Sequence, residues 1–324
     1  MATEGKISGD SQKRYSRLVD MWAAPGLNPT NIDVLTKLKS AEDRQFSKNM
    51  AITGKIFDKD TEAKTDDETH IIGIRTDIWK PSKEDRERSL NAIKKKRKQE
   101  LRDQIKSGGR LTQAEKTKLE AKVDNDDMMS MDSKNVDKAR LVLKLFRSTG
   151  KNINWKGSLE ELTVREVHQS LGSKKALITF AINLPGYEYL VQIQQCRRFF
   201  RPAVFSFAYL NDKTEEMWYI DLKKYWFSWG IDYHIEAQGK RIGKIDGKLL
   251  ALGTDSRIKI KEPALAQDQK FLDLLTLFSA SVGFHRTIWK NIRHRIKNIE
   301  SDKSAHIIED EELWLLKNPR RVMR

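Results

Sequence analysis

The chain has 324 residues, 38% of them hydrophobic and 33% charged, with 12 Phe, 8 Trp and 7 Tyr available for a core. This length predicts one or two domains. No apolar run reaches the roughly 18 residues of a membrane-spanning helix, and a single cysteine, Cys196, excludes a disulfide framework and a multi-cysteine metal site. Residues 1–20 lack the apolar core of a secretory signal, so we expect a cytoplasmic protein.

The formal net charge is +15, from 61 Lys and Arg against 46 Asp and Glu. Between residues 80 and 123 there are 15 basic and seven acidic residues, and between 286 and 297 there are five basic residues and no acid. Such an excess favours attraction to a polyanion, either nucleic acid or an anionic membrane. Solubility alone is the alternative explanation for the first cluster.

In chain order, residues 1–45 are predicted to form a polar N-terminal arm, with short helices over 14–22 and 31–39. The runs 50–57 and 71–79 have the β-branched content of strands. A barrel domain is expected over 46–298, with a charged tail over 299–324.

A helical hairpin is predicted over 82–123, inserted into the barrel domain at about 80–127. Gly108 and Gly109 form the break between its helices, and Thr112 with Glu115 makes a capping box for the second helix. The hairpin's apolar stripe is narrow, which indicates shallow docking on a partner. Its first helix carries a run of five bases, a candidate contact for a polyanion or a protein partner: Lys94, Lys95, Lys96, Arg97 and Lys98.

The next segments are harder to assign. Residues 139–146 fit a strand or a helix, residues 152–157 are turn-rich, and residues 159–168 again fit either element. From residue 174 the pattern is a series of short strands with polar turns, which predicts an antiparallel sandwich or barrel. The predicted strands are 176–182, 187–195, 203–210, 217–222, 225–229, 232–236, 241–245, 249–252 and 257–261, with a hairpin turn at Asp246-Gly247.

A single helix is predicted over 268–289. Between Phe271 and Phe284 its apolar residues lie on all sides, which is typical of a helix buried all round. Its apolar part is only about 21 Å long, short of the ~30 Å of a bilayer core, and contains Asp273. We therefore expect it to thread a closed sheet. The overall expectation is a mainly β protein with an antiparallel barrel around a hydrophobic C-terminal helix.

This order of elements resembles the tubby-like β-barrel superfamily, which includes the phospholipid scramblases and the LURP-one-related proteins. The resemblance is carried by the aromatic-rich stretch 223–236, the glycine-bearing strand 239–249 and the closing helix 271–289, whose motifs are loose. The matched region covers about 120 residues at the C-terminal side. It implies a barrel of about twelve strands, to which 50–79 and 139–146 would contribute. Tubby domains bind phosphoinositides, but no ligand residue of theirs maps onto this sequence.

No catalytic motif stands out. The six histidines have no metal-ligand spacing, and no nucleophile elbow, phosphate-binding loop or kinase signature occurs. We therefore expect no enzyme activity, no cofactor and no metal.

Several basic residues are candidate anion ligands, because guanidinium and ammonium groups suit phosphate. One group combines the arginines of a base-aromatic cluster at 197–201 with the two lysines that follow the predicted strand 217–222: Arg197, Arg198, Arg201, Lys223 and Lys224. Trp226 and Trp229 beside it are typical of a membrane interface or of base stacking, or else face the core. A second group lies on the extension of the C-terminal helix: Arg286, Lys290, Arg293 and Arg295. The acidic run 309–312 is a candidate intramolecular cover for this extension.

The predicted function is a non-enzymatic binding or adaptor protein that engages anionic phospholipid or phosphoinositide headgroups, peripherally at a membrane, with the hairpin 82–123 as an arm for a protein partner. A nucleic-acid-binding protein that uses the basic hairpin and the arginine cluster is the alternative. A phospholipid scramblase is the third hypothesis. The sequence leaves the oligomeric state undetermined.

Overall fold

A computed structural model provides the structure of the chain. It describes residues 15–22, 50–58, 68–79, 98–99, 102–103, 112–124, 139–149, 152–173, 175–196, 202–226, 232–250, 253–302, 312 and 315.

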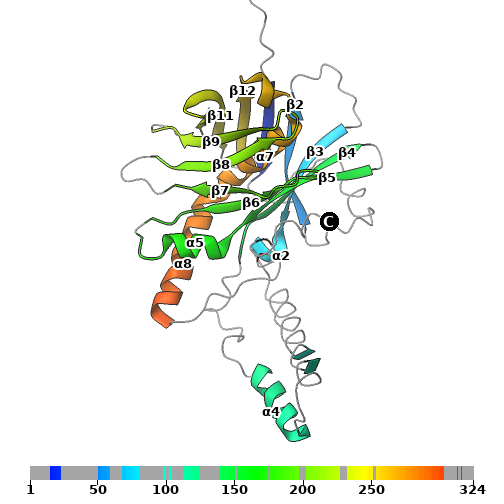
Figure 1. Ribbon diagram of the computed structural model, residues 1–324, viewed down its shortest axis with the longest axis vertical. Helices are drawn as coiled ribbons and strands as arrows, with labels where there is room; N and C mark the ends of the chain where they lie inside the picture. The colour runs from blue at the N-terminus through cyan, green and yellow to red at the C-terminus, as the bar shows by residue number, and fades with distance from the viewer. Residues whose placement is uncertain are drawn as a thin grey trace, which may run out of the picture.

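The described strands form one closed antiparallel barrel of twelve strands (Figure 1). They are β1 (Tyr15–Trp22), β2 (Met50–Asp58), β3 (Glu68–Arg75), β4 (Val142–Thr149), β5 (Asn152–Glu161), β6 (Thr179–Asn183), β7 (Val191–Gln195), β8 (Val204–Asn211), β9 (Glu216–Lys224), β10 (Tyr233–Ala237), β11 (Lys240–Leu250) and β12 (Gly253–Ile260). Each strand pairs with its neighbours in the sequence, and β1 pairs with both β2 and β12 to close the barrel. The predicted fold class is therefore confirmed.

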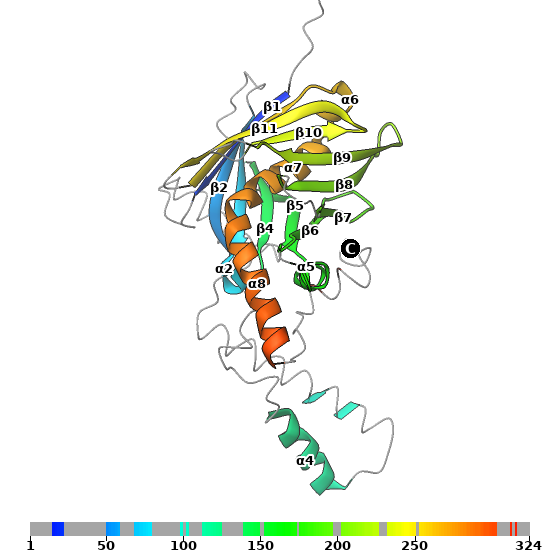
Figure 2. The ribbon, with the colours of Figure 1, turned by 90° about the vertical axis from the view of Figure 1, so that its left-hand side faces the viewer.

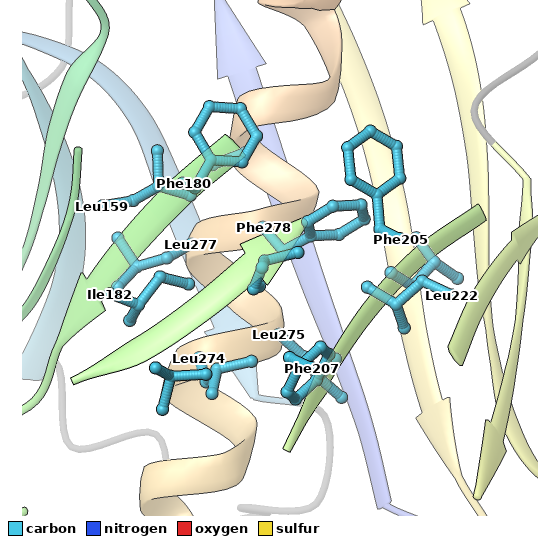
Figure 3. Packing of buried hydrophobic residues seen from close by; sticks show 14 of the residues in the cluster. Leu159, Phe180, Ile182, Phe205, Phe207, Leu222, Leu274, Leu275, Leu277 and Phe278 are labelled. Atoms are coloured by element: carbon cyan, nitrogen blue, oxygen red, sulfur yellow. The ribbon is translucent and has the colours of Figure 1, made fainter. Parts of the chain in front are cut away.

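The barrel encloses α7 (Gln269–Ser281), as the apolar pattern predicted. Every residue from Phe271 to Ser281 is buried. Leu274, Leu277 and Phe278 pack among strand residues such as Ile182 in one large core cluster (Figure 3). Asp268 begins the helix, because its carboxylate accepts hydrogen bonds from the backbone N–H groups of residues 270 and 271.

The barrel interior also holds a buried ion pair. Arg17 of β1 points inward, and its Nη1 lies 2.7 Å from Oδ1 of Asp273 and 3.0 Å from Oγ1 of Thr276 on α7. The side chain of Arg17 is fully buried and that of Asp273 is 6% exposed. This pair fixes α7 against β1, since a carboxylate inside an apolar barrel needs a counter-charge.

Two predictions for the N-terminal region are wrong. Residues 14–22 were predicted as helix, but they form β1 and complete the barrel, so the barrel does not begin at residue 46. The helical interpretation missed the period-2 pattern in which Arg17, Val19 and Met21 face inward. The helix predicted over 31–39 lies outside the described residues.

Three assignments within the meander also change. The Asp246-Gly247 turn is absent, because both residues lie inside β11 and pair with Arg257 and Ser256 of β12. The segment 152–157, predicted to be rich in turns, belongs to β5. The two ambiguous segments are now assigned: 139–146 leads into β4, and 159–168 contains the end of β5 and the start of α5 (Thr163–Ser170). Tyr225 and Trp226 lie beyond the end of β9 rather than in a separate strand.

The predicted single C-terminal helix is divided. After α7, a 3-10 turn, η3 (Val282–Phe284), leads into α8 (His285–Asp302), which leaves the barrel beside α5 and extends beyond its end (Figure 2). Short helices α2 (Thr76–Trp79) and α6 (Pro263–Ala266) flank the barrel. None of the helices in the described ranges is long and apolar enough to cross a membrane.

The helical insertion is described in part. α4 (Gln113–Asp124) follows the predicted capping box, in which the backbone N–H of Thr112 donates to Glu115 at 2.8 Å and the N–H of Glu115 donates to Oγ1 of Thr112 at 3.4 Å. Arg102 and Glu120 join its two arms by an ion pair of 2.6 Å. α4 projects away from the barrel in both views (Figures 1 and 2).

Candidate functional site

The solvent face of α8 carries four basic side chains in one line, which we call the α8 stripe: Arg286, Lys290, Arg293 and Lys297. The spacing i, i+4, i+7, i+11 places them on one side of a helix, and all four are exposed. The stripe extends about 16 Å along the helix axis at 1.5 Å per residue.

The α8 stripe has no internal charge compensation. No acidic residue occurs between 286 and 299, and none of the four side chains has an ion pair with another described residue. Like charges four residues apart destabilise a helix by about 0.2–0.5 kcal/mol per pair. The stripe therefore costs the fold a little stability, and an anionic partner would offset this cost.

The opposite face of α8 anchors it to the barrel end. Ile288 and Ile292 are fully buried, and His285 lies among the barrel's aromatic rings. Trp289 donates a hydrogen bond from Nε1 to Oε1 of Gln195 on β7 at 3.2 Å. We call this end of the barrel the α8 end.

Arg295, which the sequence assigned to the exposed basic group, is instead 2% exposed. It shares the inner face with Ile288 and Ile292 at i, i+4, i+7 spacing, so it turns toward the barrel. Its Nη1 lies 2.9 Å from Oε1 of Glu161 and 3.4 Å from Oε2 of Glu166. Arg295 therefore positions α8 and is not available to a polyanion.

The two carboxyl groups around Arg295 crowd one another. Burial raises the pKa of Glu166 well above its ordinary value, and the nearby charge of Glu161 raises it further. The other oxygens of the pair accept backbone hydrogen bonds, from Leu141 N to Glu161 Oε2 at 2.7 Å and from Thr179 N to Glu166 Oε1 at 3.2 Å. No group of three metal-ligand side chains with suitable geometry occurs in the described part of the chain.

Lys223 and Lys224, predicted to join one anion site, lie on opposite faces of β9. Lys223 faces outward, paired with Glu236 and 3.9 Å from Asp221. Lys224 is on the inward face at the α8 end, and its charge contributes to lowering the pKa of His285, an effect due mainly to burial. These two lysines therefore do not form one site.

Trp226 is exposed and lies just beyond Lys224. Its exposed fraction is 66%, so the interpretation in which it faces the core is wrong. Tyr225 beside it is held in place, stacked on His234 with ring centroids 3.8 Å apart and accepting a hydrogen bond from Arg241 at 2.8 Å.

Several predicted site residues cannot be placed. Arg197, Arg198, Arg201 and Trp229 lie outside the described residues, as do Lys94, Lys95, Lys96 and Arg97. Lys98 is described and helical, and its side chain is half-buried. Of the acidic run 309–312 only Glu312 is described, and it contacts α5 rather than the α8 stripe.

Sequence reasoning missed the buried charges around α5 and the inner face of α8. Arg140, Glu161 and Glu166 are each at most 1% exposed, although nothing in their local sequence distinguishes them from surface charges. Arg295, the partner of two of these residues, lies 134 positions after Glu161 and 129 positions after Glu166 in the sequence. The available signal was the alternation at the end of β5, where Leu159 and Glu161 are buried and Glu160 between them is half-buried.

Searches against protein-family models, curated proteins and solved structures found no match to this chain.

Proposed function

We propose that the protein is a non-enzymatic binding protein that attaches peripherally to anionic phospholipid headgroups through the α8 stripe. The observation that carries the proposal is the line of four exposed, uncompensated bases on one helix face. A straight row of cations suits a planar anionic surface, where each Lys or Arg contributes about 1 kcal/mol.

Trp226 favours a membrane over a nucleic acid as the partner. An exposed tryptophan beside a lysine is typical of the boundary between headgroups and acyl chains. Trp226 follows Lys224, which lies at the α8 end. The barrel with its enclosed helix is consistent with the tubby-like fold, and we include membership of that superfamily in the proposal.

The scramblase hypothesis is less well supported. Insertion of α7 into a bilayer would require it to leave the barrel, with loss of the core around Phe278 and of the Arg17–Asp273 pair. We therefore propose attachment at the surface of the membrane.

Vesicle flotation tests the proposal. The test variant changes all four residues of the α8 stripe to Gln, and phosphatidylcholine vesicles are compared with and without phosphatidylserine or a phosphoinositide. Loss of about 4 kcal/mol, from four side chains at about 1 kcal/mol each, lowers partitioning to the anionic vesicles about a thousandfold at low salt.

A matched control removes the same charge elsewhere, by Gln substitutions at four exposed lysines of the barrel: Lys213, Lys240, Lys248 and Lys261. This control should float almost as the wild type does. Equal losses in both variants would mean that net charge, not the α8 stripe, drives attachment. Absence of flotation, together with DNA or RNA binding whose log–log salt slope falls by about 3.6 in the α8 variant, would overturn the lipid proposal in favour of nucleic acid.

A further inference from the structure

The first turn of α5 is capped by a residue far along the chain. Leu162 occupies the N-cap position and provides no side-chain acceptor for the free N–H groups of the helix. Glu312 supplies the acceptor, because its carboxylate receives hydrogen bonds from Thr163 Oγ1 at 2.8 Å and from Val164 N at 2.9 Å. Glu312 lies 149 positions after Thr163 and is only 1% exposed.

A second side chain of the same segment enters an adjoining apolar site. Leu315 is 2% exposed and packs with Leu162 and Ala181, with the partly buried Leu190 beside them. Glu312 and Leu315 therefore occupy two neighbouring sites, one for a carboxylate and one for an aliphatic side chain. We call the residues that form them the α5 socket: Leu162, Thr163, Val164, Ala181 and Leu190.

The surroundings of the α5 socket are held together by other contacts. Arg295 of α8 pairs with Glu161 and Glu166, and Arg140 pairs with Glu160 at 2.8 Å. None of these ion pairs includes Glu312 or Leu315. The barrel and its enclosed helix are likewise complete without them. The ion pairs that hold α5 and α8 together therefore do not depend on the segment.

Docking of the segment buries the carboxylate of Glu312. Three further carboxyl groups, those of Glu160, Glu161 and Glu166, already lie around Arg140 and Arg295, and burial holds Glu166 toward its neutral form. Burial accordingly raises the pKa of Glu312, although its hydrogen bonds to α5 and the charge of Arg140 act in the other direction. Such a cost makes the docked segment easier to displace than its deep burial suggests.

We propose that the α5 socket is a recognition site for a short peptide in which Glu is followed three positions later by Leu, and that Glu312 and Leu315 occupy it as an intramolecular ligand. A partner protein with this motif displaces the segment. The inference is independent of lipid binding, because it involves neither the α8 stripe nor Trp226.

The test uses the full chain with Glu312→Ala and Leu315→Ala, and a fluorescent peptide that corresponds to residues 307–320. With a dissociation constant of about 10 µM for the peptide and an effective concentration of about 1 mM for the attached segment, fluorescence anisotropy should show about 100-fold weaker peptide binding to the wild type than to the double variant. A peptide with Glu312→Gln should bind the double variant at least about tenfold more weakly, because it loses the charge-assisted hydrogen bonds. Equal affinities for both chains, or no binding to either, would refute the proposal.

A second measurement covers the case in which the double variant does not fold. A protease site placed within residues 303–311 of the otherwise wild-type chain allows the segment to be cut after folding. The cut fragment should stay bound and be replaced by an excess of labelled peptide. Retention of the fragment against any excess, or its release without rebinding, would refute the proposed exchange between the segment and a partner peptide.

Discussion

His285 provides a test of the buried barrel end through pH. Its ring is 3% exposed and lies 5.7, 5.1 and 5.9 Å, centroid to centroid, from the rings of Phe180, Phe205 and Phe278. Burial among these rings, with a smaller contribution from the charge of Lys224, lowers the pKa of His285 from 6.5 to about 3. The folded protein therefore keeps this histidine neutral down to a pH of about 3.

The sign of the effect follows from proton linkage. Above pH 6.5 neither the folded nor the unfolded chain protonates His285, and its contribution to stability is fully present. Below that pH the unfolded chain binds a proton at His285 and the folded chain does not, so stability falls until the pH reaches about 3. At about pH 5 the loss is roughly 2 kcal/mol, since each pH unit corresponds to about 1.4 kcal/mol.

The measurement is urea unfolding of the wild type and of His285→Phe at about pH 7.5 and about pH 5. Phe suits the aromatic surroundings, and the hydroxyl of Ser281 keeps its hydrogen bond to the carbonyl oxygen of Phe278 at 2.7 Å. Any packing cost of the variant is the same at both pH values, so it cancels when the pH-induced change of the urea midpoint is compared between the two proteins. On acidification the urea midpoint of the wild type should fall about 0.7 M further than that of the variant, for a slope near 3 kcal/mol per M. Parallel changes in the two proteins would refute a buried neutral histidine, and the exposed His294→Gln serves as the control.

Three further predictions concern stability. Asp273→Ala should cost about 3–5 kcal/mol in urea unfolding because it leaves the buried Arg17 without its carboxylate, whereas pairing Asp273→Leu with Arg17→Met should recover most of that loss. Glu166→Gln, which mimics the neutral acid, should remove a decline in wild-type stability as the pH rises above about 4.5, because a raised pKa makes ionisation unfavourable in the fold. Gly243→Ala should lower the melting temperature far more than Gly239→Ala. A methyl group at 243 would lie 2.4 Å from a backbone oxygen, whereas at 239 nothing lies within 4 Å and only a φ of +80° opposes the change.

The fold could be predicted from the sequence where patterns are local. Two such patterns are the apolar residues on all sides between Phe271 and Ser281 and the short β-branched runs, which together indicate a sheet closed around a helix. β1 was missed because its alternating pattern has Arg17 at an inward position. A charged residue is normally assigned to the surface, and the local sequence does not show that Asp273 on α7 is the partner of Arg17. The Asp246-Gly247 turn was a wrong prediction because both residues lie inside β11 and pair with β12, a long-range contact that the two residue types do not indicate.

The candidate site was predictable only where it depends on local patterns. The α8 stripe follows from helical spacing alone, and the exposure of Arg286, Lys290 and Arg293 agrees with it. Arg295 sits two residues from Arg293 and looks equivalent in sequence, but the direction in which it points depends on the buried Glu161 and Glu166. Long-range pairs of this kind set which bases are free to bind, and they leave no trace in composition or periodicity.

The barrel topology explains why the candidate surfaces lie together. In an antiparallel barrel in which sequence neighbours pair, alternate connections fall at the same end, and α7 crosses the interior once from the end of β12 to the other end. The α8 end therefore has the β9–β10 connection that contains Trp226, the β5–β6 connection that contains α5, and the start of α8. At the opposite end Tyr209 donates a hydrogen bond to Asp268 at 2.6 Å, and Gln238 and Gly239 form a tight turn with positive φ. A short insertion in that turn should leave vesicle flotation unchanged, whereas Trp226→Ala at the α8 end should reduce it. The reverse result would place the membrane contact at the wrong end of the barrel for the α8 stripe to make it.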